Sequence, residues 1–120
     1  MTTTRTDTVR LGLFTIGLDT YWGQFDGLLD ALMGYHREIA GRLGGFGAGV
    51  VDAGMVDTPE KARAAAEQFR REGVEIIFLF VSTYALSSTV LPVVQGAGVP
   101  VVVLNLQPVP RLDYDAFNAL

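Results

Sequence analysis

The segment Glu75-Ile76-Ile77-Phe78-Leu79-Phe80-Val81 decides the fold of this chain. Its last six residues are all apolar, whereas a strand with one face in water alternates between polar and apolar residues. A strand over 75–81 is therefore expected to be covered on both faces. We expect it to lie at the centre of a parallel sheet.

Three other short apolar segments, at 10–16, 49–53 and 101–104, are also expected to form strands. The segment at 101–104 has the sequence Val-Val-Val-Leu and is uninterrupted in the same way as 75–81. We therefore expect this fourth strand to be buried on both faces too.

Helical signals separate the predicted strands. An apolar stripe at 3.6-residue spacing predicts one helix over 21–43, with Asp19 or Thr20 as its N-cap. The pair Thr58-Pro59 is a strong start signal for the next helix, because the donor that proline lacks has no partner in the first helical turn. The remaining helices are expected over 88–95 and from about 113 onward.

Strands that alternate with helices predict an α/β fold. We expect a flavodoxin-like three-layer sandwich around a four-stranded parallel sheet of order 2-1-3-4. A chain of 120 residues has room for one domain, which buries about 70% of the surface of the unfolded chain. Residues 1–9 are expected to form a disordered polar tail, and 10–120 a single α/β domain.

Composition argues against several kinds of partner. The net charge is −4, and the arginines of the helix after Pro59 alternate with glutamates, which disfavours a nucleic-acid surface. The chain has no cysteine, so it forms neither a disulfide nor a thiolate metal site. The polar start is not a secretion signal, and the apolar runs are shorter than the ~18 residues of a membrane span. We expect a cytoplasmic protein with no membrane or nucleic-acid partner.

Topology predicts where a ligand binds. In a sheet of order 2-1-3-4, ligands lie beyond the carboxyl ends of strands one and three, where the order reverses. The loops at that edge are 17–24, 82–88 and 105–108. Their polar and aromatic side chains are Asp19, Thr20, Tyr21, Trp22, Gln24, Ser82, Thr83, Tyr84, Ser87, Ser88, Asn105 and Gln107.

Hydroxyls, amides and aromatic faces are suited to a neutral polyhydroxylated molecule, which is bound by hydrogen bonds and stacking. The competing interpretation is that these side chains cap helices and pack on the core. For Trp22 the core role is favoured, because it begins the apolar stripe of the first helix. For the three loops together, a binding site is the better interpretation.

Sharper chemical assignments fail. The glycines at 44–49 precede a strand, whereas a dinucleotide fingerprint follows one, and there is no phosphate loop. A receiver domain would need an acidic residue where this chain has Ser82. His36 is the only histidine and is expected at a solvent-facing or rim position, and Asp52 is expected to be a turn or cap residue. No acid–base pair or metal cluster is evident from spacing.

Four motifs together resemble the N-terminal domain of the L-arabinose isomerase and L-fucose isomerase superfamily, most closely its arabinose isomerase-like branch. They occur in order and cover nearly the whole chain after residue 9. The motifs are Gly-Leu-Asp-Thr-Tyr-Trp at 17–22, Val-Asp-Thr-Pro-Glu-Lys-Ala at 56–62, Ser-Thr-Tyr-Ala-Leu-Ser-Ser-Thr-Val-Leu-Pro at 82–92 and Val-Leu-Asn-Leu-Gln-Pro at 103–108.

The resemblance implies a longer enzyme that interconverts an aldose and a ketose with a divalent cation, usually Mn²⁺. Two glutamates and two histidines that hold the metal and transfer protons lie in later domains of such enzymes, so this chain alone is expected to be inactive. The N-terminal domain of such enzymes can supply a substrate rim to a neighbouring subunit, which implies a homo-oligomer. The residues expected to contact the sugar are Asp19, Thr20, Tyr21, Trp22, Thr83, Tyr84 and Gln107.

The resemblance is not complete at the rim. Asp19 stands where many arabinose isomerases have a substrate-facing glutamine, and a carboxylate accepts hydrogen bonds but donates none. Tyr21 and Trp22 match the Leu-Tyr pair that follows, and Gln107 matches a glutamine after the fourth strand. The departure at Asp19 leaves the particular sugar open.

Two function classes follow. The chain is either the N-terminal substrate-rim and oligomerisation domain of a metal-dependent sugar isomerase, or an autonomous sugar-binding or regulatory module. Phe117 and Leu120 would be apolar residues at an exposed end, which favours a longer enzyme. That interpretation predicts a coding frame that continues past Leu120 into a segment with two Glu and two His.

Overall fold

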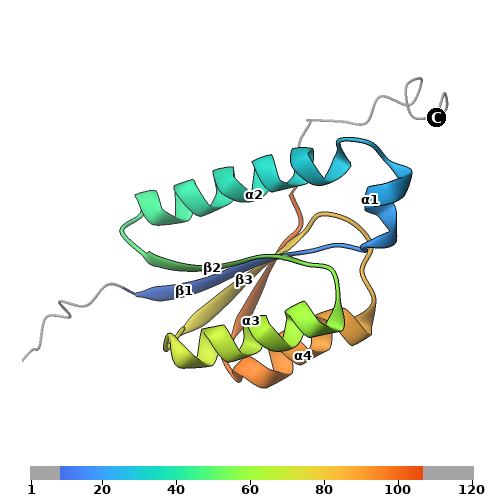
Figure 1. The fold of residues 1–120 in the computed structure, drawn as a ribbon. Helices are drawn as coiled ribbons and strands as arrows, with labels where there is room; N and C mark the ends of the chain where they lie inside the picture. Colours follow the sequence, from blue (N-terminus) through green and yellow to red (C-terminus); the bar gives the residue numbers. More distant parts are fainter. Residues whose placement is uncertain (1–8, 107–120) are drawn as a thin grey trace, which may run out of the picture.

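The computed structural model describes residues 9–106 and shows a four-stranded parallel sheet with the order β2-β1-β3-β4 (Figure 1). Strands and helices alternate along the chain, so the predicted flavodoxin-like α/β topology is confirmed. The elements are β1 (Arg10–Ile16), α1 (Thr20–Gln24), α2 (Leu28–Gly45), β2 (Gly49–Val56), α3 (Pro59–Arg71), β3 (Ile76–Val81), α4 (Ser87–Ala97) and β4 (Val101–Leu104).

The helices form two layers, with α2 on one side of the sheet and α3 and α4 on the other (Figure 1). The predicted central strand β3 lies between β1 and β4, as expected. The main core lies on the α3 side, where the rings of Phe14 and Phe69 have centroids 6.2 Å apart. Ile77 and Val93 are fully buried in the same cluster.

The first helix is not continuous, which corrects the prediction of one helix over 21–43. Helix α1 ends at Gln24 and α2 begins at Leu28. Phe25 adopts an extended conformation, and Gly27 has a φ of 77°, a left-handed conformation that glycine adopts without steric cost. The spacing of apolar residues continues across this break, so the apolar pattern alone did not reveal the turn at Gly27.

Strand β2 is longer than predicted, because it continues through Gly54 to Val56. The pairing with β1 shifts by one residue between Leu13 and Phe14, so Ala53 has no partner and β2 contains a bulge. Gly54 follows the bulge with a φ of 71°. Gly54 therefore lies next to a bulge inside β2 and does not end the strand.

Strand β4 is an edge strand, so the expectation that it is buried on both faces is wrong. It pairs only with β3 among the described residues. Val103 is 58% exposed and Val102 is 37% exposed. Within the part of the chain that the structure describes, no element covers the apolar side chains of Val102 and Val103.

The start signal of α3 is confirmed. Thr58 is its N-cap and accepts a hydrogen bond from the backbone N–H of Lys61, with Pro59 at the first helical position. The short helix predicted over 88–95 is α4. The expected tail, the last helix and Gln107 involve residues 1–8 and 107–120, which lie outside the described residues.

Candidate functional site

The loops after β1 and β3 meet at the carboxyl edge of the sheet. The Ser82 hydroxyl donates a 2.7 Å hydrogen bond to the backbone carbonyl of Ile16, the last residue of β1. Gly17 donates its backbone N–H to the carbonyl of Val56, the last residue of β2. These bonds join the ends of three neighbouring strands, so the loops after β1 and β3, two of the three that topology selected, lie together.

The segment after β1 presents its polar groups to solvent. Asp19 and Thr20 are both exposed, and no residue of α1 is buried. Asp19 occupies the N-cap position of α1, but its side chain makes no capping hydrogen bond. The carboxylate of Asp19 and the hydroxyl of Thr20 are therefore available to a ligand.

In the segment after β3, one hydroxyl is already used in a local hydrogen bond. Thr83 donates its hydroxyl to the backbone carbonyl of Tyr84 at 3.0 Å. The Tyr84 side chain is 65% exposed. Tyr21, on the other loop, packs its ring edge-on to Phe25 with centroids 6.0 Å apart. Of the two tyrosines, Tyr84 is the more exposed and has the freer aromatic face.

Trp22 is half-buried and makes a specific contact with the end of β2. Its indole Nε1 donates a 2.7 Å hydrogen bond to Oδ2 of Asp57. The ring also lies against Gly17, where an added Cβ would come within 2.9 Å of Cζ2 of Trp22. Trp22 is thus directed toward the β2 side of the edge rather than toward the space between β1 and β3.

Asp57 and Lys61 are members of this edge that sequence reasoning missed. The Asp57 carboxyl is only 5% exposed, and the Lys61 ammonium lies 2.9 Å from its Oδ1. The contact is an ion pair between an exposed ammonium and a buried carboxylate oxygen. The available signal was an acidic residue directly before the Thr58 cap, at the carboxyl end of a strand.

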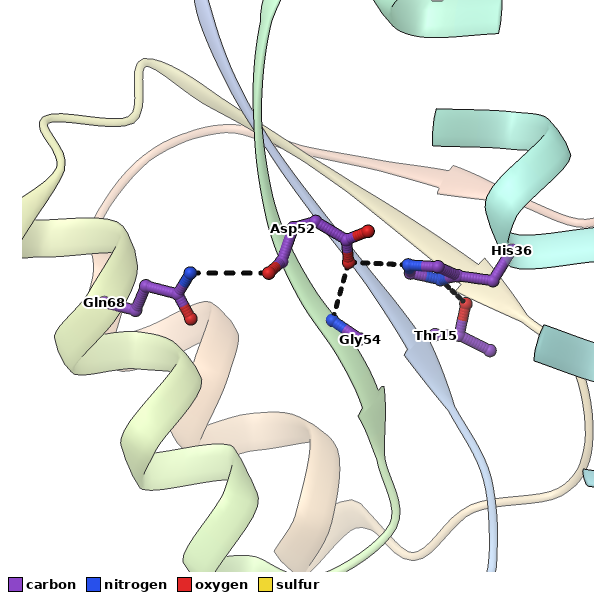
Figure 2. Close-up of polar contacts among 5 residues, drawn as sticks. All are labelled: Thr15, His36, Asp52, Gly54 and Gln68. Atoms are coloured by element: carbon purple, nitrogen blue, oxygen red, sulfur yellow. Dashed lines mark hydrogen bonds and ion pairs between the residues drawn. The ribbon is translucent and has the colours of Figure 1, made fainter. Parts of the chain in front are cut away.

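A second polar cluster joins α2 to the sheet (Figure 2). The Nδ1 atom of His36 lies 2.6 Å from the Thr15 hydroxyl, and its Nε2 lies 2.6 Å from Oδ1 of Asp52. The same Oδ1 accepts the backbone N–H of Gly54 at 2.8 Å, and the Asp52 carbonyl accepts from Gln68 on α3. A neutral ring that donates from Nε2 and accepts at Nδ1 satisfies both side-chain partners.

The prediction that His36 faces solvent is wrong, because the residue is 1% exposed. The sequence contained a signal for this. Leu32 and Ile39 belong to the apolar stripe, and position 36 fills the gap between them at helical spacing. The expectation for Asp52 is correct in part: it bonds the backbone at the β2 bulge and also bonds His36.

Threonine, histidine and aspartate in one hydrogen-bonded chain have the order of a nucleophile, a base and an orienting acid. Thr15 has no exposed surface, however, and His36 is enclosed between α2 and the sheet. A nucleophile must reach a carbonyl or similar centre of a substrate. The cluster is therefore structural.

The described residues contain no group of three or more His, Asp or Glu side chains that could hold a metal ion. The family resemblance implies a Mn²⁺ held by residues of later domains, and the described residues do not bring together the several oxygen or nitrogen ligands that such an ion needs. Within 9–106, no helix has the length and apolar character needed to cross a membrane.

No protein-family model, curated protein or solved structure matches this chain.

Proposed function

We propose that this chain is the N-terminal domain of a metal-dependent aldose–ketose isomerase of the L-arabinose isomerase type, and that its carboxyl edge contributes to the sugar site. One observation carries the proposal. The Ser82 hydroxyl bond to Ile16 brings the loops after β1 and β3 together, while Asp19, Thr20 and Tyr84 stay exposed there. Exposed hydrogen-bonding groups beside an aromatic face are suited to a sugar.

The side chains have distinct parts in this proposal. The carboxylate of Asp19 accepts hydroxyl hydrogens, and the hydroxyls of Thr20 and Thr83 both donate and accept. The rings of Tyr21 and Tyr84 offer surfaces for the C–H face of a sugar. Trp22, which the resemblance also implies as a contact, bonds Asp57 through its indole nitrogen. Gln107 is the remaining contact proposed from the resemblance.

The proposal assigns catalysis to other domains of the same enzyme. When bound there, the divalent cation supplies Lewis-acid polarisation of the sugar carbonyl and hydroxyl. The residues of this chain bind and orient the substrate. In a homo-oligomer they would do so at the rim of a neighbouring subunit's site.

The exposed edge of β4 supports a larger assembly. An apolar strand with free N–H and C=O groups is a pairing surface that proteins usually cover. Val103 and Leu106 are each more than half exposed at this edge. Cover from another part of the same enzyme, or from a neighbouring subunit, accounts for an apolar sequence at a strand that the described residues leave open.

An autonomous sugar-binding or regulatory module is the second candidate. Two hydrogen bonds within the chain favour the module, because Ser82–Ile16 and Trp22–Asp57 hold the site loops without help from another domain. The coding sequence separates the two candidates. A frame that continues past Leu120 into a segment with two Glu and two His supports the isomerase, and a stop codon there together with sugar binding supports the module.

The sugar site itself can be tested on this chain by NMR titration with L-arabinose up to high millimolar concentration. We expect amide shift changes that concentrate in 19–22 and 83–84, with glycerol at equal concentration as the control ligand. Asp19→Ala should reduce these shifts, and Asp30→Ala, a change of the same type on α2, should not. An absence of sugar-specific shifts at this edge would contradict the proposal.

A further inference from the structure

Helix α1 and its N-cap Asp19 carry four of the seven proposed sugar contacts, but few contacts hold this helix in place. It has five residues, none of them buried, and no side-chain cap at Asp19. A helix this short has no independent stability in water. Its position must therefore be determined by contacts with the rest of the domain.

One side-chain hydrogen bond connects α1 to the sheet in the described part of the chain, the bond from Trp22 Nε1 to Asp57 Oδ2. Asp57 lies between Val56, the last residue of β2, and Thr58, the N-cap of α3. The Trp22 ring also rests on Gly17, which lacks the side chain that would displace it. Trp22 is thus positioned by a hydrogen bond to Asp57 and by packing against Gly17.

A carboxyl group that is 95% buried is costly unless its charge is compensated. The compensation comes from the Lys61 ammonium on one oxygen and the Trp22 indole on the other. Hydrogen bonds to ionised acceptors are stronger than neutral ones. A buried carboxylate at this place is thus well suited to hold an indole.

We infer that Asp57 is a positioning residue for the sugar-binding edge: it holds Trp22, and through Trp22 it fixes the exposed side chains of Asp19 and Thr20 and the partly buried ring of Tyr21. The role in sugar binding rests on the proposed function, whereas the anchoring of α1 does not. Lys61 neutralises Asp57 and leaves its Oδ2 free for the indole.

The test uses the fluorescence of Trp22, which is the only tryptophan in the chain. Asp57→Ala removes the acceptor and should shift the emission to longer wavelength as the indole becomes hydrated. Asp57→Asn retains an acceptor oxygen and should keep the emission close to that of the wild type. Asp30→Ala is the matched control, because it removes an exposed carboxylate from α2 without touching Trp22.

The second readout is the affinity for L-arabinose, measured by NMR titration on the same variants. Asp57→Ala should weaken binding by about tenfold, the effect of losing one charge-assisted hydrogen bond, and Asp57→Asn should recover most of it. An Asp57→Ala variant with unchanged emission and affinity overturns the inference. A shifted emission with unchanged affinity overturns the positioning role.

Two further measurements separate a failure of the anchoring of α1 from a failure of the proposed sugar binding. If Asp57→Ala does not fold, Trp22→Phe removes the donor instead, and hydrogen exchange of the Phe25 N–H, which bonds the Tyr21 carbonyl in α1, should then become faster. Unchanged exchange overturns the anchoring. A wild-type chain that binds no sugar refutes the proposed function, while the emission shift and the exchange rate still decide whether Asp57 anchors α1.

Discussion

Nε2 of His36 lies 2.6 Å from Oδ1 of Asp52, so a fully buried ring on α2 is joined to a half-exposed carboxylate on β2. The other ring nitrogen bonds the buried hydroxyl of Thr15 on β1. Polar groups in a low-dielectric interior must be paired, and here each group pairs with the next. The cluster fixes how α2 sits on the sheet.

His36→Ala should destabilise the domain by about 3–5 kcal/mol, because it leaves a cavity and removes the partner of the Thr15 hydroxyl. Urea unfolding followed by circular dichroism measures this change. Arg37→Ala, at the exposed neighbouring position, should change stability by less than about 0.5 kcal/mol. Equal stabilities of the two variants would show that the cluster contributes nothing.

Asp52→Asn should cost less than Asp52→Ala. The asparagine amide oxygen still accepts from His36 and from the Gly54 N–H, whereas alanine loses both bonds. Because the Asp52 carboxyl is 43% exposed, we expect only about 1–2 kcal/mol for alanine and less than about 1 kcal/mol for asparagine. Chemical denaturation of both variants decides this, and the reverse order would disprove the assignment of the bonds.

Gly17→Ala should displace Trp22. The added methyl group would come within 2.9 Å of both the Trp22 ring and the Met55 sulfur, at a cost of about 1–3 kcal/mol. The emission of Trp22 should shift together with the stability. Gly23→Ala is the matched control in α1, because nothing lies within 4 Å of its new methyl group. That variant should be neutral or slightly stabilising, since alanine favours a helix over glycine.

The isolated chain should show no isomerase activity with Mn²⁺ and L-arabinose. The reason is that its described residues contain no cluster of metal ligands. The assay is ketose formation against a blank with metal and sugar alone. Turnover above that blank would refute the assignment of catalysis to other domains.

If the proposed function is correct, Gln107→Ala, made in the proposed full-length isomerase, should weaken sugar binding and leave metal affinity unchanged. Losing one neutral hydrogen bond costs about 0.5–1.5 kcal/mol, so KM should rise by a factor of about 2–12. Steady-state kinetics and a metal titration on the same variant separate the two effects. Unchanged KM and kcat would show that Gln107 does not contact the sugar.

Local patterns were sufficient for the order of elements. The uninterrupted apolar run at 75–81 predicted the inner strand β3, and the Thr58-Pro59 pair predicted the start of α3. The predicted strand order 2-1-3-4, which is that of a flavodoxin-like fold, is confirmed. Errors arose where glycine had two possible meanings: Gly27 interrupts a helix, and Gly54 follows a bulge inside a strand.

The candidate site was predicted only in part. Topology selected the loops after β1 and β3, and the bond from Ser82 to Ile16 shows that these loops meet. Asp57 was missed because its partner Trp22 lies 35 positions earlier in the chain. No spacing rule relates residues so far apart unless the fold is already known.

The sequence by itself determined the order of the strands and helices and most of their positions, because hydrophobic period, capping and proline geometry act over a few neighbouring residues. Only the tertiary structure decided which polar groups are buried and paired. His36 bonds Thr15 on β1 and Asp52 on β2. Trp22 on α1 bonds Asp57, the residue that follows β2. Those pairings depend on distances across space, which the order of residues along the chain does not specify.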